Sequence, residues 1–241
     1  MAELDRDQGE RSSVTTTDLK AMGFHVVEWL VSSFLDYFQP RFAAPNGRGR
    51  ARLRMAQRPG SNHPVANVFA KGATPPSSID RVMMARCIEL SKETPKGELP
   101  FAALVTQGGR IVAQSHNRVV RDCDVSRHAE LVALVEAQTV TGSLRLRDCV
   151  LYTNVEPCPM CSFAIRETGI DRVVYAIRSR AMGGHSRWSI LDDDQLSRVM
   201  PGYFSPPPEL VADFCAEEAE KVWNDRHPLI WRMIKARGCL G

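Results

Sequence analysis

The sequence has no apolar stretch long and uncharged enough to cross a membrane. Its most apolar early run, residues 22–38, is interrupted by Glu28 and Asp36, whereas a bilayer span needs about 20 largely apolar residues. That run also does not fit a secretory signal, because a polar stretch precedes it and no small-residue cleavage site follows it. The cysteines number seven, and an odd count argues against a disulfide framework. We therefore expect a cytoplasmic protein with no membrane partner.

The larger, C-terminal part of the chain lacks an excess of either charge. Residues 75–241 contain 21 basic and 21 acidic side chains. The net charge of +3 comes from the remainder, where residues 41–74 contribute seven basic side chains and residues 1–40 contribute three basic and seven acidic ones. A nucleic-acid surface usually shows as a basic excess or stripe. The neutral part therefore predicts a small substrate rather than a polyanion.

The composition changes at about residue 75. Before it, residues 40–60 are rich in arginine, proline and glycine and poor in apolar residues, which is typical of a linker. We expect residues 1–74 to form an N-terminal extension, largely disordered, with one possible short helix over residues 22–38. Residues 75–241 are expected to form one folded domain, since the length allows one good-sized core.

Regular hydrophobic periods begin near residue 77. Helices are predicted over residues 79–90, 128–137 and 158–168, the first capped by Ser77 or Ser78 and the last ended by Gly169. Strands are predicted over residues 101–106, 110–115, 150–155 and 171–177, and the Gly-containing turn at 107–109 joins the first two in a hairpin. Residues 209–237 are predicted as a single long amphipathic helix that packs on the core or on a second subunit.

Three soft metal ligands and one carboxylate occur in two short motifs, His128-Ala129-Glu130 and Pro157-Cys158-Pro159-Met160-Cys161. A catalytic zinc ion keeps one of its four positions for water, so His128, Cys158 and Cys161 would leave that position open. Zinc lowers the pKa of a bound water to about 7, and Glu130 is well spaced to move its proton. A structural zinc site would require a fourth nearby Cys or His, for which Cys123 and Cys149 are poorly placed.

The predicted helices also place these ligands usefully. His128 and both motif cysteines fall at the amino-terminal ends of two helices. The unpaired N–H groups and the positive end of the helix dipole stabilise thiolates there, and a metal needs its cysteines deprotonated.

The arrangement resembles that of the zinc deaminases of the cytidine deaminase superfamily. The wording is closest to the guanine deaminases and the tRNA adenosine deaminases, through the motifs above, Pro100-Phe101-Ala102-Ala103, Asn117-Arg118-Val119 and Glu156. The resemblance covers residues 77–177 well and the following part loosely. It implies an α/β fold, a three-layer α/β/α sandwich with a central mixed sheet, and a homodimer with Zn²⁺ as cofactor. It also implies hydrolytic release of an exocyclic amine as ammonia, with Glu130 transferring the protons.

The same resemblance implies substrate contacts. Asn117 would hydrogen bond to the base, the turn containing Phe101 would form a wall of the pocket, and the backbone N–H of Ala129 would contact the base edge. The alternative for Asn117 is an ordinary asparagine at a strand end. Residues 181–194 depart from the guanine deaminases, whose acidic residue reads the guanine edge, because the acidic residues here come only after a tryptophan. We expect His185 and Trp188 in this segment to line the pocket.

The substrate expected from the sequence is a small nucleobase or nucleoside, guanine-like or cytosine-like. The alternative is an adenosine in tRNA, converted to inosine at the anticodon wobble position. A non-enzymatic zinc protein is a third possibility, but such a protein has no need of a carboxylate at Glu130.

Overall fold

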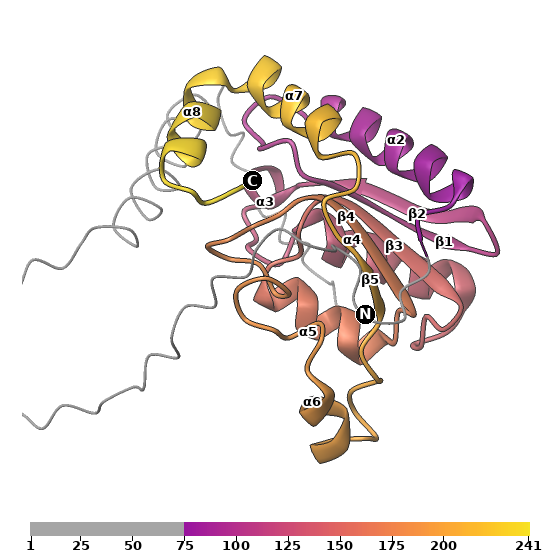
Figure 1. Ribbon diagram of the computed structural model, residues 1–241. Coiled ribbons are helices and arrows are strands. Elements are labelled where there is room, and N and C mark those ends of the chain that lie inside the picture. The colour runs from indigo at the N-terminus through magenta and orange to yellow at the C-terminus, as the bar shows by residue number, and fades with distance from the viewer. Residues whose placement is uncertain (1–74) are drawn as a thin grey trace, which may run out of the picture. The chain divides into compact units, whose positions relative to one another are not determined.

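The computed structural model describes residues 75–241, and a five-stranded mixed sheet runs through their centre (Figure 1). The strand order is β2-β1-β3-β4-β5. The strands are β1 (Ala102–Gln107), β2 (Arg110–His116), β3 (Cys149–Val155), β4 (Arg172–Ile177) and β5 (Glu209–Val211). β1 is antiparallel to β2 and β3, whereas β3, β4 and β5 are parallel. The four predicted strands are confirmed, and the three-residue β5 was too short to be predicted from alternation.

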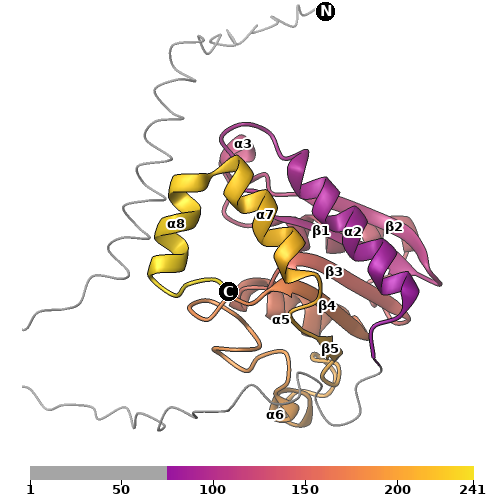
Figure 2. The ribbon, with the colours of Figure 1, turned by 45° about the horizontal axis from the view of Figure 1, so that its top comes forward.

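Helices cover both faces of this sheet, as expected for a three-layer α/β/α sandwich (Figures 1 and 2). α2 and α7 lie on one face, and α4 and α5 lie side by side on the other. The helices are α2 (Ser78–Lys92), α3 (Val119–Asp122), α4 (Ala129–Thr141), α5 (Pro159–Thr168), α6 (Asp194–Val199), α7 (Ala216–Arg226) and α8 (Pro228–Ala236).

The ends of two helices follow from residues identified in the sequence. The backbone N–H of Asp80 donates to Ser77 Oγ at 3.1 Å, and the backbone N–H of Ser77 donates to Asp80 Oδ2 at 2.7 Å, so both residues satisfy helix-end groups reciprocally. Ser77 is therefore the cap, as one of the two predicted candidates. Gly169 ends α5 in the left-handed region at φ +76°, a conformation that glycine adopts without steric cost.

The predicted single helix over residues 209–237 is wrong. The segment begins as β5, continues as α7 and breaks at His227 before α8. Pro228 explains the break, because proline disfavours helical geometry in the residue before it and has no N–H to continue the ladder. Trp223 and Trp231 then pack against each other across the corner, with ring centroids 5.8 Å apart.

The segments that carry the sequence motifs meet at one end of the sheet. Strand register places Ala102 opposite His116, Ala103 opposite Thr153, and Val155 beside Ile177. The start of β1 and the ends of β2, β3 and β4 therefore meet at this end of the sheet. At this end Asn117 directly follows β2, and Glu156 directly follows β3.

No helix within residues 75–241 is long and apolar enough to cross a bilayer. The expectations for residues 1–74, including a short helix, lie outside the described residues.

Candidate active site

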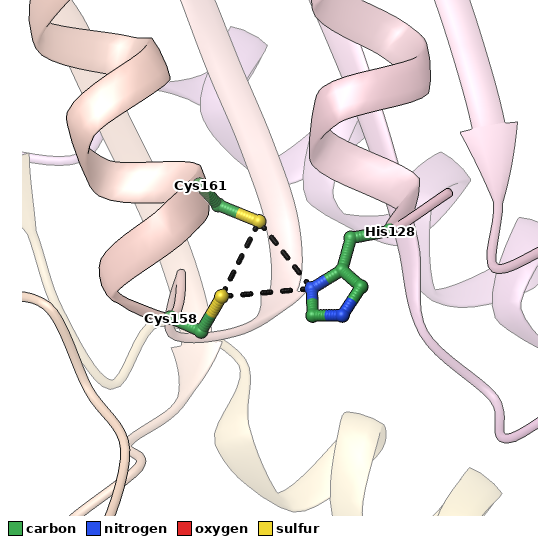
Figure 3. A group of neighbouring side chains, drawn as sticks. All are labelled: His128, Cys158 and Cys161. Carbon is green, nitrogen blue, oxygen red and sulfur yellow. Dashed lines mark hydrogen bonds between the residues drawn. The ribbon is translucent and has the colours of Figure 1, made fainter. Parts of the chain in front are cut away.

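His128, Cys158 and Cys161 come together where α4 and α5 begin (Figure 3). His128 is the residue immediately before α4, Cys158 is the residue immediately before α5, and Cys161 lies in the first turn of α5. The three distances among His128 Nδ1, Cys158 Sγ and Cys161 Sγ are each 3.5 Å. The predicted position of these residues at two helix ends is confirmed.

These distances match the edges of a zinc tetrahedron. With Zn–S near 2.3 Å and Zn–N near 2.0 Å, tetrahedral angles place two sulfur ligands about 3.8 Å apart and a sulfur and a nitrogen about 3.5 Å apart. Little movement is needed to reach that geometry from the observed spacing. The three donors therefore fit a Zn²⁺ ion, with both cysteines and His128 Nδ1 as ligand atoms.

The cluster has three candidate ligands. Within residues 75–241, His128, Cys158 and Cys161 form the only group of His, Cys, Asp or Glu donors close enough to hold a metal ion. Cys149 is buried in β3 and Cys123 is exposed before α4, and neither joins the group. A bound zinc ion would keep an open position, which is typical of catalytic rather than structural sites.

The two cysteines differ in acidity. A hydrogen bond with Cys161, followed in importance by one with His128, lowers the pKa of Cys158 to about 4 against the effect of burial. The same interaction with Cys158, together with burial, raises the pKa of Cys161 well above its ordinary value. Of the two thiols Cys158 ionises more readily, and both would bind a zinc ion as thiolates.

Glu130 lies beside the cluster without belonging to it. Its side chain is buried at the start of α4, Thr153 Oγ1 donates to its Oε1 at 3.2 Å, and Cys161 Sγ lies 3.6 Å from its Oε2. Burial raises the pKa of Glu130 above its ordinary value. A carboxyl group with a raised pKa takes up a proton more readily than an exposed one, which suits a group that accepts and returns protons.

Asn117 and Phe101 are hydrogen-bonded neighbours at the same end of the sheet. The backbone N–H of Asn117 donates to Phe101 O at 2.9 Å, and the backbone N–H of Arg118 donates to the carbonyl of Arg127, which precedes His128, at 3.0 Å. The amide Nδ2 of Asn117 donates to Glu98 Oε2 at 2.6 Å. The bond between Arg118 and Arg127 joins the segment that begins at Asn117 to the residue before His128, and the bond between Asn117 and Phe101 joins that segment to the start of β1.

A second buried glutamate, Glu156, organises the loop after β4. Its Oε1 accepts from the backbone N–H groups of His185 and Ser186 at 3.0 and 2.6 Å, and its Oε2 accepts from Ser179 N and Ser186 Oγ at 2.7 and 2.8 Å. A Cβ on Gly183 would lie 2.2 Å from Glu156 Oε1. Because Glu156 stands two residues before Cys158, this carboxylate ties the loop to the metal ligands.

Comparisons with known proteins agree with this geometry. The family described as the cytidine and deoxycytidylate deaminase zinc-binding region matches residues 77–177. A tRNA-specific adenosine deaminase of Aquifex aeolicus is 33% identical over 139 residues, which cover 57% of this chain and 91% of that protein. The chain belongs to the cytidine deaminase superfamily.

The chain is also similar to a second curated protein and to a solved structure. A tRNA-specific adenosine deaminase of Streptococcus pyogenes is 34% identical over 110 residues, covering 45% of this chain and 69% of that protein. A structure from a study of A-to-I editing by tRNA:A34 deaminases superposes with a TM-score of 0.53 at 24% identity, covering 59% of this chain and 99% of the other. That likeness establishes the fold. Zinc is the metal of this family of deaminases, and the cluster fits it.

The remaining predicted pocket residues of this deaminase lie in different surroundings. Ala129 is fully buried as the first residue of α4. His185 Nδ1 lies 2.8 Å from the hydroxyl of Tyr175, which holds its ring against β4. Trp188 is 49% exposed, with the Arg187 guanidinium 5.5 Å from its ring centroid. Neither His185 nor Trp188 hydrogen bonds to the metal cluster among the described residues.

Glu98 and the role of Glu156 were not found from the sequence. Glu156 directly precedes the Pro157-Cys158-Pro159-Met160-Cys161 motif, and that position was a signal of a role near the site. Glu98 had no comparable signal, because a glutamate in a turn is ordinarily a solvated residue. Only its burial, at 2% exposed, distinguishes it.

Proposed function

We propose that this protein is a zinc-dependent deaminase that converts adenosine to inosine in tRNA, at the anticodon wobble position. The observation that carries the proposal is the Aquifex aeolicus relative, because the similarity covers 91% of a tRNA-specific adenosine deaminase. This ranking reverses the one drawn from charge, which placed a small base or nucleoside first.

The chemistry assigned to the chain rests on the cluster and Glu130. His128, Cys158 and Cys161 would hold the metal, which supplies an activated water when bound. Glu130 would move two protons in turn: one from the water whose oxygen adds to the ring carbon to the neighbouring ring nitrogen, and one from the newly added hydroxyl to the amine, so that the C–N bond breaks, ammonia leaves and a carbonyl remains. The Thr153 hydroxyl oxygen, 3.2 Å from Oε1 of Glu130 and 2.9 Å from Val155 O, lies beside the carboxyl group and would help to position it.

The substrate base would enter between the metal cluster and Asn117. Enzymes of this chemistry act on unpaired or extruded bases, which they read by hydrogen bonds and by packing against apolar side chains. Asn117 supplies amide hydrogen bonds, and Phe101, held edge-on to Trp223 at 5.0 Å between centroids, supplies the apolar wall. Both roles are proposals, and they are supported by the position of these residues at the end of the sheet that carries the sequence motifs.

A free base or nucleoside is the second candidate substrate, and the charge of the domain favours it. Residues 75–241 have equal numbers of basic and acidic side chains and so no net field to attract a polyanion. The basic excess of the chain is confined to residues 41–74.

A direct experiment separates the two candidates. The full-length, zinc-loaded protein is incubated with an anticodon stem-loop bearing adenosine at the wobble position, and in parallel with adenine, guanine, cytosine and their nucleosides, at 50 and 200 mM salt. Inosine in the stem-loop, formed at a rate that falls with salt because phosphate contacts release counterions, supports the proposal. Salt-independent ammonia release from a free base, with no inosine in the stem-loop, supports the second candidate instead.

The homodimer stays a prediction from the family resemblance, and the cytoplasmic location stays a prediction from the cysteine count and the lack of a secretory signal. Light scattering of the purified protein tests the first, and cell fractionation tests the second.

A further inference from the structure

Glu98 is a buried carboxylate that contacts Asn117, the residue proposed above to bind the base. It is 2% exposed and lies between α2 and β1. Oε2 accepts from Asn117 Nδ2 at 2.6 Å, and Oε1 accepts from the backbone N–H of Arg121 at 2.8 Å. Among the ion pairs of residues 75–241, none involves Glu98. Both oxygens are instead used to hold the segment that follows β2.

This contact determines which way the Asn117 amide faces. A carboxylate whose two oxygens both accept hydrogen bonds cannot donate, so the atom facing it must be the amide nitrogen. The opposite orientation would place Asn117 Oδ1 against Glu98 and leave two acceptors in contact. One amide orientation is therefore strongly preferred, and it leaves Oδ1 and the second N–H available to a ligand.

Glu98 is itself held by the C-terminal part of the domain. The Arg226 guanidinium donates to the carbonyls of Lys92 and Thr94, and the backbone N–H of Glu98 donates to Pro95 O at 3.2 Å. The turn that carries Glu98 is thus fastened to the end of α7. A carboxylate fixed in this way can orient its partner without moving when a substrate binds.

We propose that Glu98 is a positioning residue that presents Oδ1 and one N–H of Asn117 to the bound base, and that it thereby sets base selection. The inference rests on the pocket role proposed above for Asn117. A donor next to an acceptor matches a base edge with the complementary pair, as an asparagine does with adenine. Glu98 does not touch the metal ligands or Glu130, so its effect falls on substrate binding and discrimination.

The test is Glu98→Gln, compared with Glu93→Gln as the matched control. Glu93 is an exposed glutamate just after α2 that pairs with Arg86. With an amide at position 98, both Asn117 orientations can be satisfied, so we expect KM to rise by about tenfold and the preference for the best substrate over the next to fall. Zinc content, kcat within about threefold and the pH profile of kcat are expected to stay as in the parent, as transition-state proton transfer is untouched.

A second variant, Glu98→Gln with Asn117→Asp, separates orientation from packing. The hydrogen bond between positions 98 and 117 is kept with donor and acceptor exchanged, so the melting temperature should recover any loss seen in the single variant. KM should stay raised, because the side chain at 117 then offers acceptors only. Recovery of both melting temperature and KM would show that Glu98 serves packing alone and would overturn the proposal.

An unchanged KM and unchanged selectivity in the single variant, with Asn117→Ala strongly impaired, would likewise overturn it. The measurement uses whichever substrate the parent protein deaminates. If that substrate is a free base, the tRNA proposal fails while the role of Glu98 is still decided by the same comparison.

Discussion

The two ends of the sheet bury carboxylates in different ways. At the end where β4 and β5 begin, Arg172 lies between Asp80 and Glu209, with a distance of 3.2 Å to Asp80 and a second ion pair to Glu209. At the end that carries the metal cluster, the buried glutamates are Glu98, Glu130 and Glu156. None of these three belongs to an ion pair among the described residues, and each is held by N–H, O–H or S–H groups instead.

The difference reflects what each end does. An arginine between two carboxylates offsets part of their negative charge and joins α2 to β4 and β5, which is a structural task. A carboxylate held by backbone N–H groups keeps its acceptor oxygens directed at particular atoms and so orients a loop or a side chain. Changes at the first end should therefore affect stability alone, whereas changes at the second should affect metal binding, turnover or selectivity, in some cases together with stability.

Removing a metal ligand should have the largest effect. In Cys158→Ala or Cys161→Ala we expect zinc to fall far below the parent's content and activity to fall to background, because two remaining ligands hold the ion poorly. The folded state should also lose stability, since metal binding is coupled to folding. Metal analysis with a melting curve provides the measurement, and Cys123→Ala, at an exposed cysteine outside the cluster, is the control. A variant that keeps full zinc would remove that cysteine from the site.

Glu130→Gln should come next, with zinc and fold retained and turnover reduced by more than about a hundredfold. The amide fills the same space but cannot accept and return a proton. Steady-state rates measured on zinc-loaded protein test this, and activity within tenfold of the parent would contradict the assigned role.

Gly183→Ala tests the loop that Glu156 holds. The new Cβ would meet the Glu156 carboxylate at 2.2 Å, so four hydrogen bonds must shift, and we expect a loss of about 2–4 kcal/mol in the free energy of unfolding. Gly202→Ala is the matched control, because its Cβ would meet nothing within 4 Å. Equal denaturation midpoints for the two variants would show that the loop is not held by this close approach.

Asp80→Asn tests the opposite end, and its effect should depend on pH. Burial opposes ionisation of Asp80, but hydrogen bonds from Ser77 and Tyr152 and the charge of Arg172 outweigh it and lower the pKa below 3.8. A lowered pKa contributes stability above pH 3.8 and loses it as pH falls through the folded-state value. We expect the variant to lose about 1–3 kcal/mol at pH 7, and the difference from the parent to shrink below pH 3.8. Deamination by the folded variant should stay near the parent's rate.

The smallest effect is expected from removing residues 1–70. Both ends of the sheet, the cluster and their described contacts lie within residues 75–241. Melting temperature and activity on the preferred substrate should therefore change little. A truncated protein that fails to fold would show that the N-terminal residues contribute to the core or to a subunit interface.

Much of the architecture could be predicted because its signals are local. The spacing of apolar residues predicts four strands and three helices, and Ser77 and Gly169 mark helix ends. Pro228 is a local signal against a single long C-terminal helix. β5 could not be predicted, since three residues are too few for a period and its pairing with β4 depends on the rest of the sheet.

The sequence by itself determined the metal ligands proposed for this protein and the carboxylate beside them, because His128, Glu130, Cys158 and Cys161 stand in two short motifs, each at the start of a helix. Only the tertiary structure decided what surrounds them. Glu98 meets Asn117 across 19 positions of the chain, and Glu156 meets Ser186 across 30. Contacts over such separations are created by strand order and register, and no local pattern records them.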